Sequence, residues 1–463
     1  MASFLQELTP HLPAICYFCA KRKMKNTLLA IFLLLSTALT ALAQAELLQS
    51  GPMLGYNEMK EVLLWVQTTE AAEVQFDYWP AEDAKDRHNT ATYQTNAAEA
   101  FTARLIADEV EPGIDYEYEL KINGKTVRRP YPLTFSAQPL WQYRTDPLAF
   151  DVAIGSCFYV NEPRYDRPGN GYGGDYEIFE AIHEKRPDAM VWLGDNTYLR
   201  EADWYTMTGI FHRHTHTRSL PELQPLLAST HHYAIWDDHD FGPNDSDRSF
   251  IHKDKTLEAF KLFWGNPSYG LPDTDGGITS YFQYHDMDFF LLDDRYFRSP
   301  NYRKSGKATI MGEEQLEWLI DALVKSRAPF KLVCIGGQVL NTAAVHENYS
   351  HHHAEERAYL LRRIAEEGIR NVVFLTGDRH HTEMSQYRNS AGYRVADITV
   401  SPLTSGAARN VEEENKLRVE GTLVTERNFG ILRFEGPRKE RKLTITVYNT
   451  AGEELWSQEL ESE

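Results

Sequence analysis

The sequence predicts an α/β domain preceded by a smaller all-β domain. Residues 46–145 contain short runs in which apolar and polar side chains alternate, the pattern of half-buried β-strands. From 148 to 463 the pattern becomes a buried strand, a charged loop and a helix, repeated several times. At 463 residues the chain also exceeds the span of most single hydrophobic cores. We therefore expect two domains, one at 46–145 and one at 148–463.

The first domain is expected to be a β-sandwich. Alternating runs occupy 62–68, 72–78 and 116–122, and turn signals such as Pro112-Gly113 and Asn123-Gly124 separate them. About seven short strands fit into this length, and no helical period is visible. This combination is typical of sandwiches of the immunoglobulin or fibronectin type III kind (Ig-like or Fn3-like).

The second domain is expected to hold a largely parallel sheet with helices on both faces, because its strands and helices alternate. The histidines at 212, 214 and 216 are expected to lie in a loop near the site entrance. The sequence ranges that predict strands are 150–154, 189–193, 233–236, 332–335 and 372–375. Those that predict helices are 176–185, 257–263, 313–325 and 355–367.

Residues 1–43 are expected to form a signal peptide. A basic segment at 21–25 precedes an apolar core at 28–35, and Ala41-Leu42-Ala43 fits a small-x-small cleavage site. Met24 is a second candidate for the first residue. The apolar core is shorter than the ~20 residues that a membrane anchor needs. The mature chain is therefore expected to be periplasmic or secreted, without an integral membrane segment.

Charge and cysteine content narrow the classes of partner. A formal charge of −19 argues against nucleic acid, whose phosphates recruit basic patches. A phosphate-bearing substrate remains possible where bound metals reverse the local sign. Removal of the signal peptide leaves Cys157 and Cys334, which in an exported protein could form a disulfide. The sequence does not indicate an oligomeric state.

Potential metal ligands follow five of the predicted strands. Each has a simpler structural explanation when taken alone, such as a helix cap or buried packing. The carboxyl ends of parallel strands share one edge of a sheet, so we expect the side chains to meet there. Carboxylates packed so closely need a cation among them, and two ions bridged by Asp195 would suit reactions at phosphorus. The candidates are Cys157, Asp195 with Tyr198, Asp237 to Asp240, Gln338, and Asp378 with His380.

Four of these segments match a family pattern, in order. They are Gly155-Ser156-Cys157, Leu193-Gly194-Asp195-Asn196-Thr197-Tyr198, Trp236-Asp237-Asp238-His239-Asp240 and Thr376-Gly377-Asp378-Arg379-His380. The set resembles the alkaline phosphatase D (PhoD-like) family of the metallophosphoesterase superfamily, and with the Fn3-like domain the resemblance covers nearly the whole mature chain. It implies a metallophosphoesterase-type αββα sandwich at 148–463. The superfamily's more usual first motif, D-x-H, is replaced by Ser156-Cys157.

The resemblance also implies a set of ligands. Cys157, Asp195 and Tyr198 would hold a trivalent iron (Fe3+), and Asp195 would bridge to one or more calcium ions. Asp238, Asp378 and His380 would supply further ligands, and other divalent metals are possible. His239 would lie near the leaving oxygen as electrostatic partner or proton donor.

Two further residues are candidates for contact with the substrate. Asn244 could bind a metal or the phosphate, or instead form an Asx turn after Pro243. Arg295 could neutralise a substrate phosphate, or instead pair with Asp293 or Asp294. The histidines at 351–353 are expected to form an exposed rim.

The favoured function is an exported metal-dependent phosphoester hydrolase, in which a metal-activated hydroxide attacks phosphorus in line. A phosphodiesterase or phospholipase D-type activity on the same site is the alternative. A calcium-binding adhesion or carbohydrate-binding protein would explain the sandwich and the acidity, but not Tyr198 or the 377–380 segment. A serine hydrolase is disfavoured because no G-x-S-x-G motif occurs in the chain.

Overall fold

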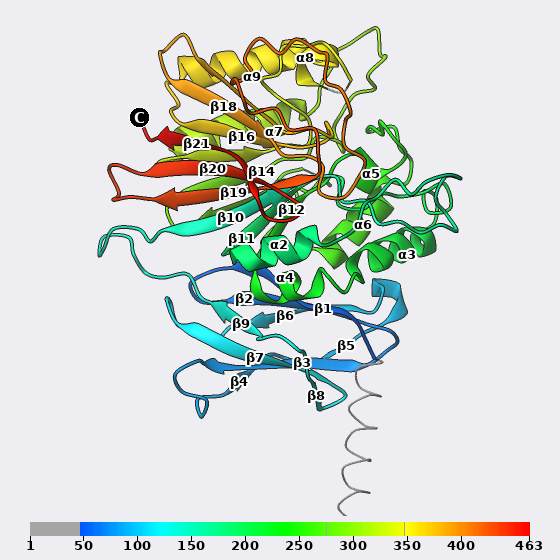
Figure 1. The fold of residues 1–463 in the computed structure, drawn as a ribbon. Coiled ribbons are helices and arrows are strands. Elements are labelled where there is room, and N and C mark those ends of the chain that lie inside the picture. The colour runs from blue at the N-terminus through cyan, green and yellow to red at the C-terminus, as the bar shows by residue number, and fades with distance from the viewer. Residues whose placement is uncertain (1–46, 275, 347) are drawn as a thin grey trace, which may run out of the picture.

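The computed structural model describes residues 47–463 except 275 and 347. The predicted signal peptide at 1–43 lies outside the described residues. Within the described part of the chain, no helix combines the length and the apolar character needed to cross a bilayer. Figure 1 shows the N-terminal strands gathered at one end of the molecule and helices α8 and α9 at the opposite end.

The N-terminal region consists of short strands and one 3-10 helix, and it encloses an apolar core of its own. One of its sheets contains β1, β2 and β6, and the other has the order β4-β3-β7-β8, with β5 and β9 paired at its sides. This arrangement confirms the predicted β-sandwich. The elements are β1 (Leu48–Asn57), β2 (Val62–Thr68), β3 (Glu73–Pro80), β4 (His88–Asn89), β5 (Tyr93–Gln94), η1 (Ala97–Glu99), β6 (Thr102–Ala107), β7 (Asp115–Ile122), β8 (Lys125–Val127) and β9 (Thr134–Ser136).

The larger region alternates strands with helices and closes with three antiparallel strands. Its first half comprises β10 (Phe150–Gly155), α2 (Ile178–Lys185), β11 (Ala189–Leu193), α3 (Met207–Arg218), α4 (Gln224–Ser229), β12 (His231–Ile235), α5 (Asp238–Phe241) and α6 (Lys253–Phe263). Its second half comprises β13 (Ser280–Tyr284), β14 (Met287–Leu291), α7 (Gly312–Lys325), β15 (Lys331–Cys334), α8 (Tyr349–His352), α9 (Ala354–Glu366), β16 (Val372–Thr376), β17 (Glu383–Arg388), β18 (Arg394–Thr399), β19 (Asn428–Glu435), β20 (Lys442–Asn449) and β21 (Glu454–Glu461).

Two sheets lie between the helices and form the predicted αββα layers. One has the order β21-β20-β19-β10-β11-β12 before it continues into β1-β2-β6, and the other has the order β13-β14-β15-β16-β18-β17. Successive residues of a strand point to opposite faces. Phe290 and Val333 accordingly pack with α7 and α9, whereas their neighbours Phe289 and Leu332 join the core shared with the first sheet.

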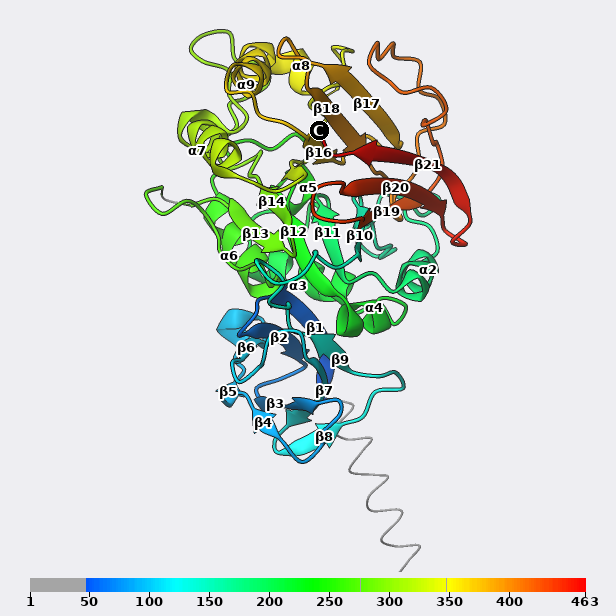
Figure 2. The ribbon, with the colours of Figure 1, turned by 90° about the vertical axis from the view of Figure 1, so that its left-hand side faces the viewer.

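Main-chain pairing joins the β-sandwich to the larger region. β1 lies parallel to β12, with Leu54 opposite His231, so one sheet runs through both regions. The main-chain N–H of Asn57 donates to the Tyr233 hydroxyl at 3.0 Å, and the Tyr118 hydroxyl donates to the carbonyl of Ala228 at 2.8 Å. Figure 2 shows this junction from the side, with β1 directly below the larger region. The boundaries at 145 and 148 stay a prediction.

The four predicted helices form as α2, α6, α7 and α9, with ends that differ by a few residues. The loop expected at 212–216 is wrong, because these residues lie in α3. This helix has no apolar stripe, since its buried residues other than Ile210 are polar. His214 packs on the ring of Phe263, and the buried Arg213 pairs with Asp203 and Glu162.

Candidate metal centre

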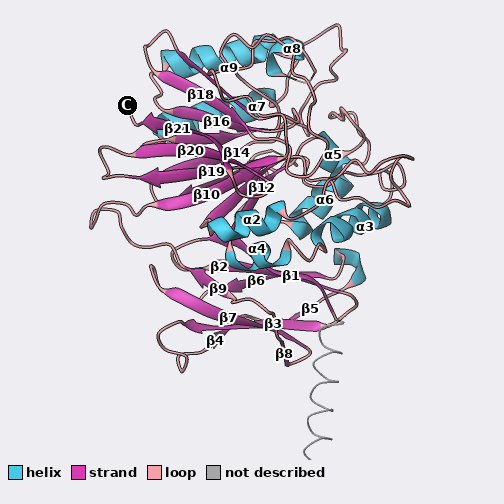
Figure 3. Cartoon of the chain, in the orientation of Figure 1, coloured by secondary structure: helices cyan, strands magenta, loops and turns pink. Residues whose placement is uncertain are grey.

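The predicted ligands meet where strands of the two sheets end. Cys157 follows β10, Asp195 and Tyr198 follow β11, and Asp238 begins α5 after β12. Asp378 and His380 follow β16 of the other sheet. The parallel pairing of β10, β11 and β12 brings the first three loops to a common edge. Figure 3 shows long loops gathered around α5 at this edge.

The backbone at this edge is strained. Cys157, Asp195, Asp378 and His380 have φ angles of 61°, 52°, 67° and 55°, in the left-handed region that residues other than glycine seldom adopt. Such conformations cost of order 1–3 kcal/mol each and cluster at functional sites. Four of the six predicted ligands share this feature, which supports a binding role for the edge.

Glycine precedes both aspartates because the strand ends approach one another closely. A Cβ atom at Gly194 would lie 2.7 Å from the Cβ of Asp237, and one at Gly377 would lie 2.5 Å from the Cβ of Ser156. No other residue fits at either position without displacing a neighbouring strand end. The two Gly-Asp pairs of the sequence therefore have a structural cause.

A first potential ligand group combines Cys157, Asp195 and His380, whose ligand atoms lie within 4.8 Å of one another. The thiol of Cys157 lies 3.7 Å from Oδ2 of Asp195. The Tyr198 hydroxyl donates to the same oxygen at 3.0 Å and lies 3.4 Å from Nε2 of His380. Thiol, phenol, carboxyl and imidazole groups thus converge on one point.

A second group combines Asp195, Asp238 and His239, again within 4.8 Å. The main-chain N–H of His239 donates to Oδ1 of Asp195 at 3.3 Å, and that of Asp245 donates to Oδ2 of Asp238 at 2.7 Å. The His239 ring lies 4.3 Å from the ring of Tyr198. Asp195 belongs to both groups, so one carboxylate is placed between two potential cation positions.

Burial and mutual repulsion set the pKa values of these groups. Burial, reinforced by Asp238 and Cys157, raises the pKa of Asp195 well above its usual value. Burial, with the nearby Asp378, raises the pKa of the Cys157 thiol to about 11. Burial also acts to raise the pKa of Asp238, but the charges of His239 and Arg295 outweigh it and lower that pKa. The protein alone therefore disfavours the charged forms of Asp195 and Cys157, and a cation would favour them.

The donor set fits bound cations. Oδ1 of Asp238 is buried and has no hydrogen-bond partner among the described residues, an arrangement that costs free energy unless a ligand binds the oxygen. Oxygen and imidazole donors suit hard or borderline cations, and a thiolate beside a phenolate suits a strongly polarising one. Cys157, Asp195, Tyr198 and His380 would surround one ion, and Asp195, Asp238 and His239 another.

Four of the six predicted ligands face a cavity of about 680 Å³. Its metal-side wall is formed by Asp195, Asp238, His239, Asp378 and His380. The cavity is also lined by Asn301, Tyr302, His346, His351 and His352, a set that we call the far wall. Five carboxylates but only one guanidinium, that of Arg379, line the cavity among the described residues, a formal charge of −4 with neutral histidines. A phosphate would be repelled from this cavity unless cations were present.

Of the two predicted substrate contacts, Asn244 lies on the cavity and Arg295 does not. Asn244 is exposed and lines the cavity, in a position where its amide can reach a ligand. Arg295 does not line the cavity, because its guanidinium is buried in an ion pair with Asp237 and lies 3.9 Å from Asp294. Of the partners proposed from the sequence, Asp294 is therefore present, although Asp237 is much closer.

Two residues near the ligands had no signal in the sequence. The Tyr172 hydroxyl lies 2.9 Å from Nδ1 of His380 and can fix the orientation of that ring. The Ser401 hydroxyl lies 3.2 Å from the Cys157 thiol and accepts the main-chain N–H of His380 at 2.8 Å. Both residues lie in irregular segments, where no periodicity marks them. Their neighbours Gly173 and Pro402 predict turns only.

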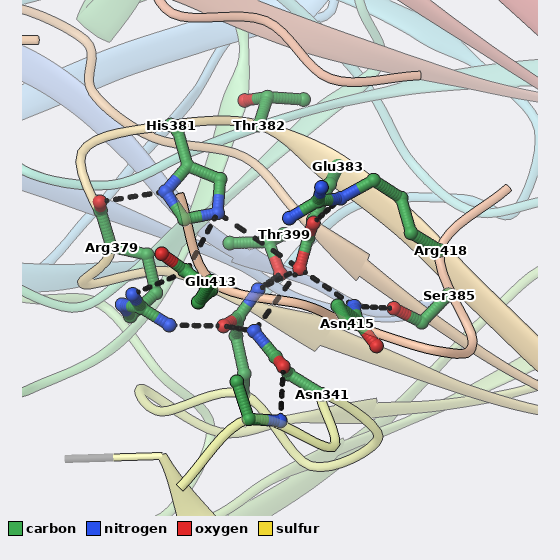
Figure 4. Close-up of polar contacts among 12 residues, drawn as sticks. Asn341, Arg379, His381, Thr382, Glu383, Ser385, Thr399, Glu413, Asn415 and Arg418 are labelled. Carbon is green, nitrogen blue, oxygen red and sulfur yellow. Dashed lines mark hydrogen bonds and ion pairs between the residues drawn. The ribbon is translucent and has the colours of Figure 1, made fainter. Parts of the chain in front are cut away.

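A buried polar network lies behind the cavity and contains Gln338, one of the residues predicted to be a ligand. Gln338 was expected at the metal edge, but its amide nitrogen donates to Glu383 at 2.8 Å and its oxygen accepts from Arg379 at 2.6 Å. Figure 4 shows Asn341, Asn415 and Arg418 also converging on Glu383. The expectation that Gln338 is a ligand is wrong, because its hydrogen bonds are used within this network.

The disulfide considered from the sequence is absent. Cys157 and Cys334 are both buried free thiols. Cys334 is the last residue of strand β15 and pairs with Leu375 of β16, whereas Cys157 lies beyond the end of β10. The thiol of Cys157 is therefore available as a ligand.

Solved structures share the fold. The chain resembles the "Structure of PhoD" at 17% identity, with a TM-score of 0.72 and coverage of 90% of this chain and 93% of that one. It also resembles purple acid phosphatase PPD1 from yellow lupin (Lupinus luteus) seeds at 12% identity, with a TM-score of 0.64 and coverage of 89% and 74%. No curated protein matches the chain. The fold is thus that of the metallophosphoesterases.

Family models give the membership. The model described as PhoD-like phosphatase matches residues 156–437, and a domain of unknown function, DUF7800, matches 45–140. The chain belongs to the PhoD-like phosphatase family, and it is a metal-dependent phosphoric ester hydrolase. This membership confirms the expected class, a phosphoester hydrolase, and disfavours the alternative of a calcium-binding adhesion or carbohydrate-binding protein.

Proposed function

We propose that the protein is an exported phosphoester hydrolase in which two cations share Asp195. The supporting observation is that Asp195 belongs to both ligand groups at the strand ends. When bound, the ions supply a hydroxide nucleophile at neutral pH and positive charge for the phosphoryl oxygens in the transition state. The positive charge of the ions would also offset the negative charge of the cavity, which would otherwise repel an entering phosphate.

The proposed identity of the ions rests on the types of ligand and on the family resemblance. A thiolate and a phenolate together suit a trivalent iron, which Cys157, Tyr198 and Asp195 would hold. Asp238 and Asp378 offer carboxylate oxygens that suit calcium, and His380, which is grouped with Cys157, would complete the ligands of the iron. A preparation that contained neither iron nor calcium yet turned over at full rate would contradict this assignment.

Two side chains are placed to act on the substrate. The His239 imidazole lines the cavity and belongs to the second ligand group; where the carboxylates of that group hold the ion, its ring can instead donate a proton to the leaving oxygen or stabilise its charge. The Asn244 amide can donate a hydrogen bond to a non-bridging phosphoryl oxygen. Arg295 would act indirectly, because its ion pair fixes Asp237 next to the ligand Asp238.

A phosphodiesterase or phospholipase D-type activity is the second candidate. The cavity of about 680 Å³ is in the range of sites for drug-sized ligands, so it has room for a second ester arm. Both activities use the same ligands and differ in which groups contact that arm.

Hydrolysis of a phosphomonoester and a phosphodiester chromogen, measured side by side with and without chelator, tests the proposal. We expect turnover that chelator abolishes, and the ratio of the two rates selects the activity. Absence of turnover of both esters by metal-replete protein would contradict the proposal.

Export has its own test, because the segment that supports it lies at 1–43. Protein recovered from the outer compartment of the producing cell should begin at Gln44, just after the predicted cleavage site. Full-length protein confined to the cytoplasm would contradict export.

A further inference from the structure

The far wall of the cavity is lined with rings. Tyr302, at the cavity mouth, is 83% exposed and lies 5.7 Å from the ring of His352. The His351 and His352 rings stack at 3.8 Å with an interplanar angle of 27°. All three residues line the same cavity as Asp195 and Asp238, so the ring surface and the ligands face one space.

The helix that carries the two histidines is fixed from behind. The main-chain N–H of Tyr349, the first residue of α8, donates to the carbonyl of Gln338 at 3.0 Å. Oδ1 of the preceding Asn348 accepts from Arg379 at 2.7 Å. Arg379 is held in turn by Glu413 in the network of Figure 4. The histidines therefore project from an anchored element.

The segment that carries Tyr302 is tied to the same wall. Oδ1 of Asn301 accepts from the buried Arg298 guanidinium at 3.1 Å. The hydroxyl of Ser299 lies 3.4 Å from Nε2 of His353, which immediately precedes α9. These contacts hold Tyr302 beside α8 and keep the ring surface at a fixed side of the cavity.

The two walls of the cavity differ in charge, so each would bind a different part of a substrate. Asp195, Asp238 and Asp378 lie on the metal-side wall, where cations and a phosphate would bind. The far wall presents the tyrosine ring, imidazoles and an amide, and the nearby Glu413 is paired with Arg379. Flat rings of a ligand stack well on such side chains.

We propose that Tyr302, His351 and His352 form a leaving-group subsite that binds a flat ring system, such as the base of a nucleoside phosphate. The proposal rests on the proposed function, because it assigns the part of the substrate that leaves. The reacting phosphate would bind at the metal-side wall, and the ring would stack at the cavity mouth.

Two phosphomonoesters of primary alcohols test the subsite, namely adenosine 5′-monophosphate and glycerol 1-phosphate. Their leaving groups have similar intrinsic reactivity, so a difference in KM reports contacts with the leaving group. We expect a KM at least about fivefold lower for the adenosine ester. The corresponding methyl diesters serve if the protein cleaves only diesters.

Variants of Tyr302 test whether its ring causes the lower KM for the adenosine ester. Tyr302→Ser should raise KM for the adenosine ester about tenfold, a change of about 1.4 kcal/mol, with glycerol phosphate changed less than twofold. Tyr302→Phe keeps the ring and should retain the preference. Tyr143→Ser, which removes a ring of matching 85% exposure that does not line the cavity, should change neither KM.

Equal KM values for the two esters, or a preference that Tyr302→Ser leaves intact, would overturn the subsite while hydrolysis itself still supports the proposed function. If the wild-type protein hydrolysed neither the two monoesters nor their methyl diesters, the proposed function would be overturned, and the subsite with it.

Discussion

The metal-side wall and the far wall of the cavity differ in how their polar groups are satisfied. On the metal-side wall, Asp195 and Asp238 are buried close together, and one oxygen of Asp238 has no partner among the described residues. Behind the far wall, the equally buried Glu383 accepts from Gln338, Asn415 and Arg418. The first arrangement would be completed by a bound cation, whereas the second is complete in the protein alone.

The same kind of side chain can therefore serve two purposes. A buried carboxylate surrounded by donors stabilises the fold, and one surrounded by other carboxylates forms a site that binds cations. Removing a group from the metal-side wall should then affect metal binding and rate, and removing one from behind the far wall should affect stability.

The largest effect is expected for Asp195→Asn. Because Asp195 belongs to both ligand groups, its loss should lower kcat at least about a thousandfold, or about 4 kcal/mol, and reduce bound metal. Steady-state kinetics and elemental analysis would measure both quantities. Asp288→Asn is the matched control, since Asp288 is also buried but bonds Tyr281 and Ser326 away from the cavity. A metal-replete Asp195→Asn enzyme with normal kcat would contradict the bridging role.

Glu383→Leu should lower the free energy of unfolding by about 3–5 kcal/mol, because it leaves the Arg418 guanidinium without its carboxylate. Urea denaturation followed by fluorescence would measure the change. Metal content of the folded variant should stay that of the wild type. A loss of metal without a loss of stability would reverse the roles assigned to the two walls.

The stability that Glu383 contributes should depend on pH. Burial alone would raise its pKa, but hydrogen bonds and charge from His381 and Arg418 outweigh it and lower the pKa to about 2. Because the folded pKa lies below the unfolded value of 4.5, the contribution is full above pH 4.5 and is lost as pH falls toward 2. Comparison of wild type with Glu383→Gln across this range should show a difference that shrinks with acid. A constant difference would contradict the depressed pKa.

Cys157→Ala should lower kcat about a hundredfold, or about 2.7 kcal/mol, by removing one ligand of the first group while the second stays intact. Cys334→Ala removes the other buried thiol, which is the last residue of β15 and does not line the cavity, and should leave metal content and kcat unchanged. If both variants behaved alike, the thiol of Cys157 would be a packing group.

Asn244→Ala should have the smallest effect, a fall in kcat/KM of about tenfold, or about 1.4 kcal/mol, from loss of one hydrogen bond to the phosphoryl group. Kinetics with unchanged metal content would support contact with substrate. A loss of metal would instead make Asn244 a ligand.

The metal-side wall was predictable because strand ends have a local signature. An apolar run followed by Gly-Asp indicates both the strand and the polar group at its end, and the parallel sheet brings such ends together. The ordered motifs then named the family. What the sequence did not resolve was the partner of Arg295, since Asp237 lies 58 residues away in the chain.

The exposed rim expected at 351–353 is correct for His351 only, because His352 is half-buried and His353 is buried. The role of Tyr302 and the helix α3 escaped prediction for a related reason. Tyr302 lies in an irregular segment, and Glu383 is surrounded by partners from distant parts of the chain, so no periodicity marks either role. In α3 the buried positions other than Ile210 are polar, so Arg213 and His214 concealed the helical pattern that apolar residues would have shown. Pattern analysis finds apolar faces, and it misses elements that bury paired charges.

The number of ions bound per chain tests the central claim most directly. Metal-free protein should be titrated with cations while bound metal and phosphoester hydrolysis are measured together, in wild type and in Asp195→Asn. We predict two ions per wild-type chain, with activity only when both are bound, and fewer than two in the variant. Full activity with a single ion, or two tightly held ions in Asp195→Asn, would contradict a centre bridged by Asp195.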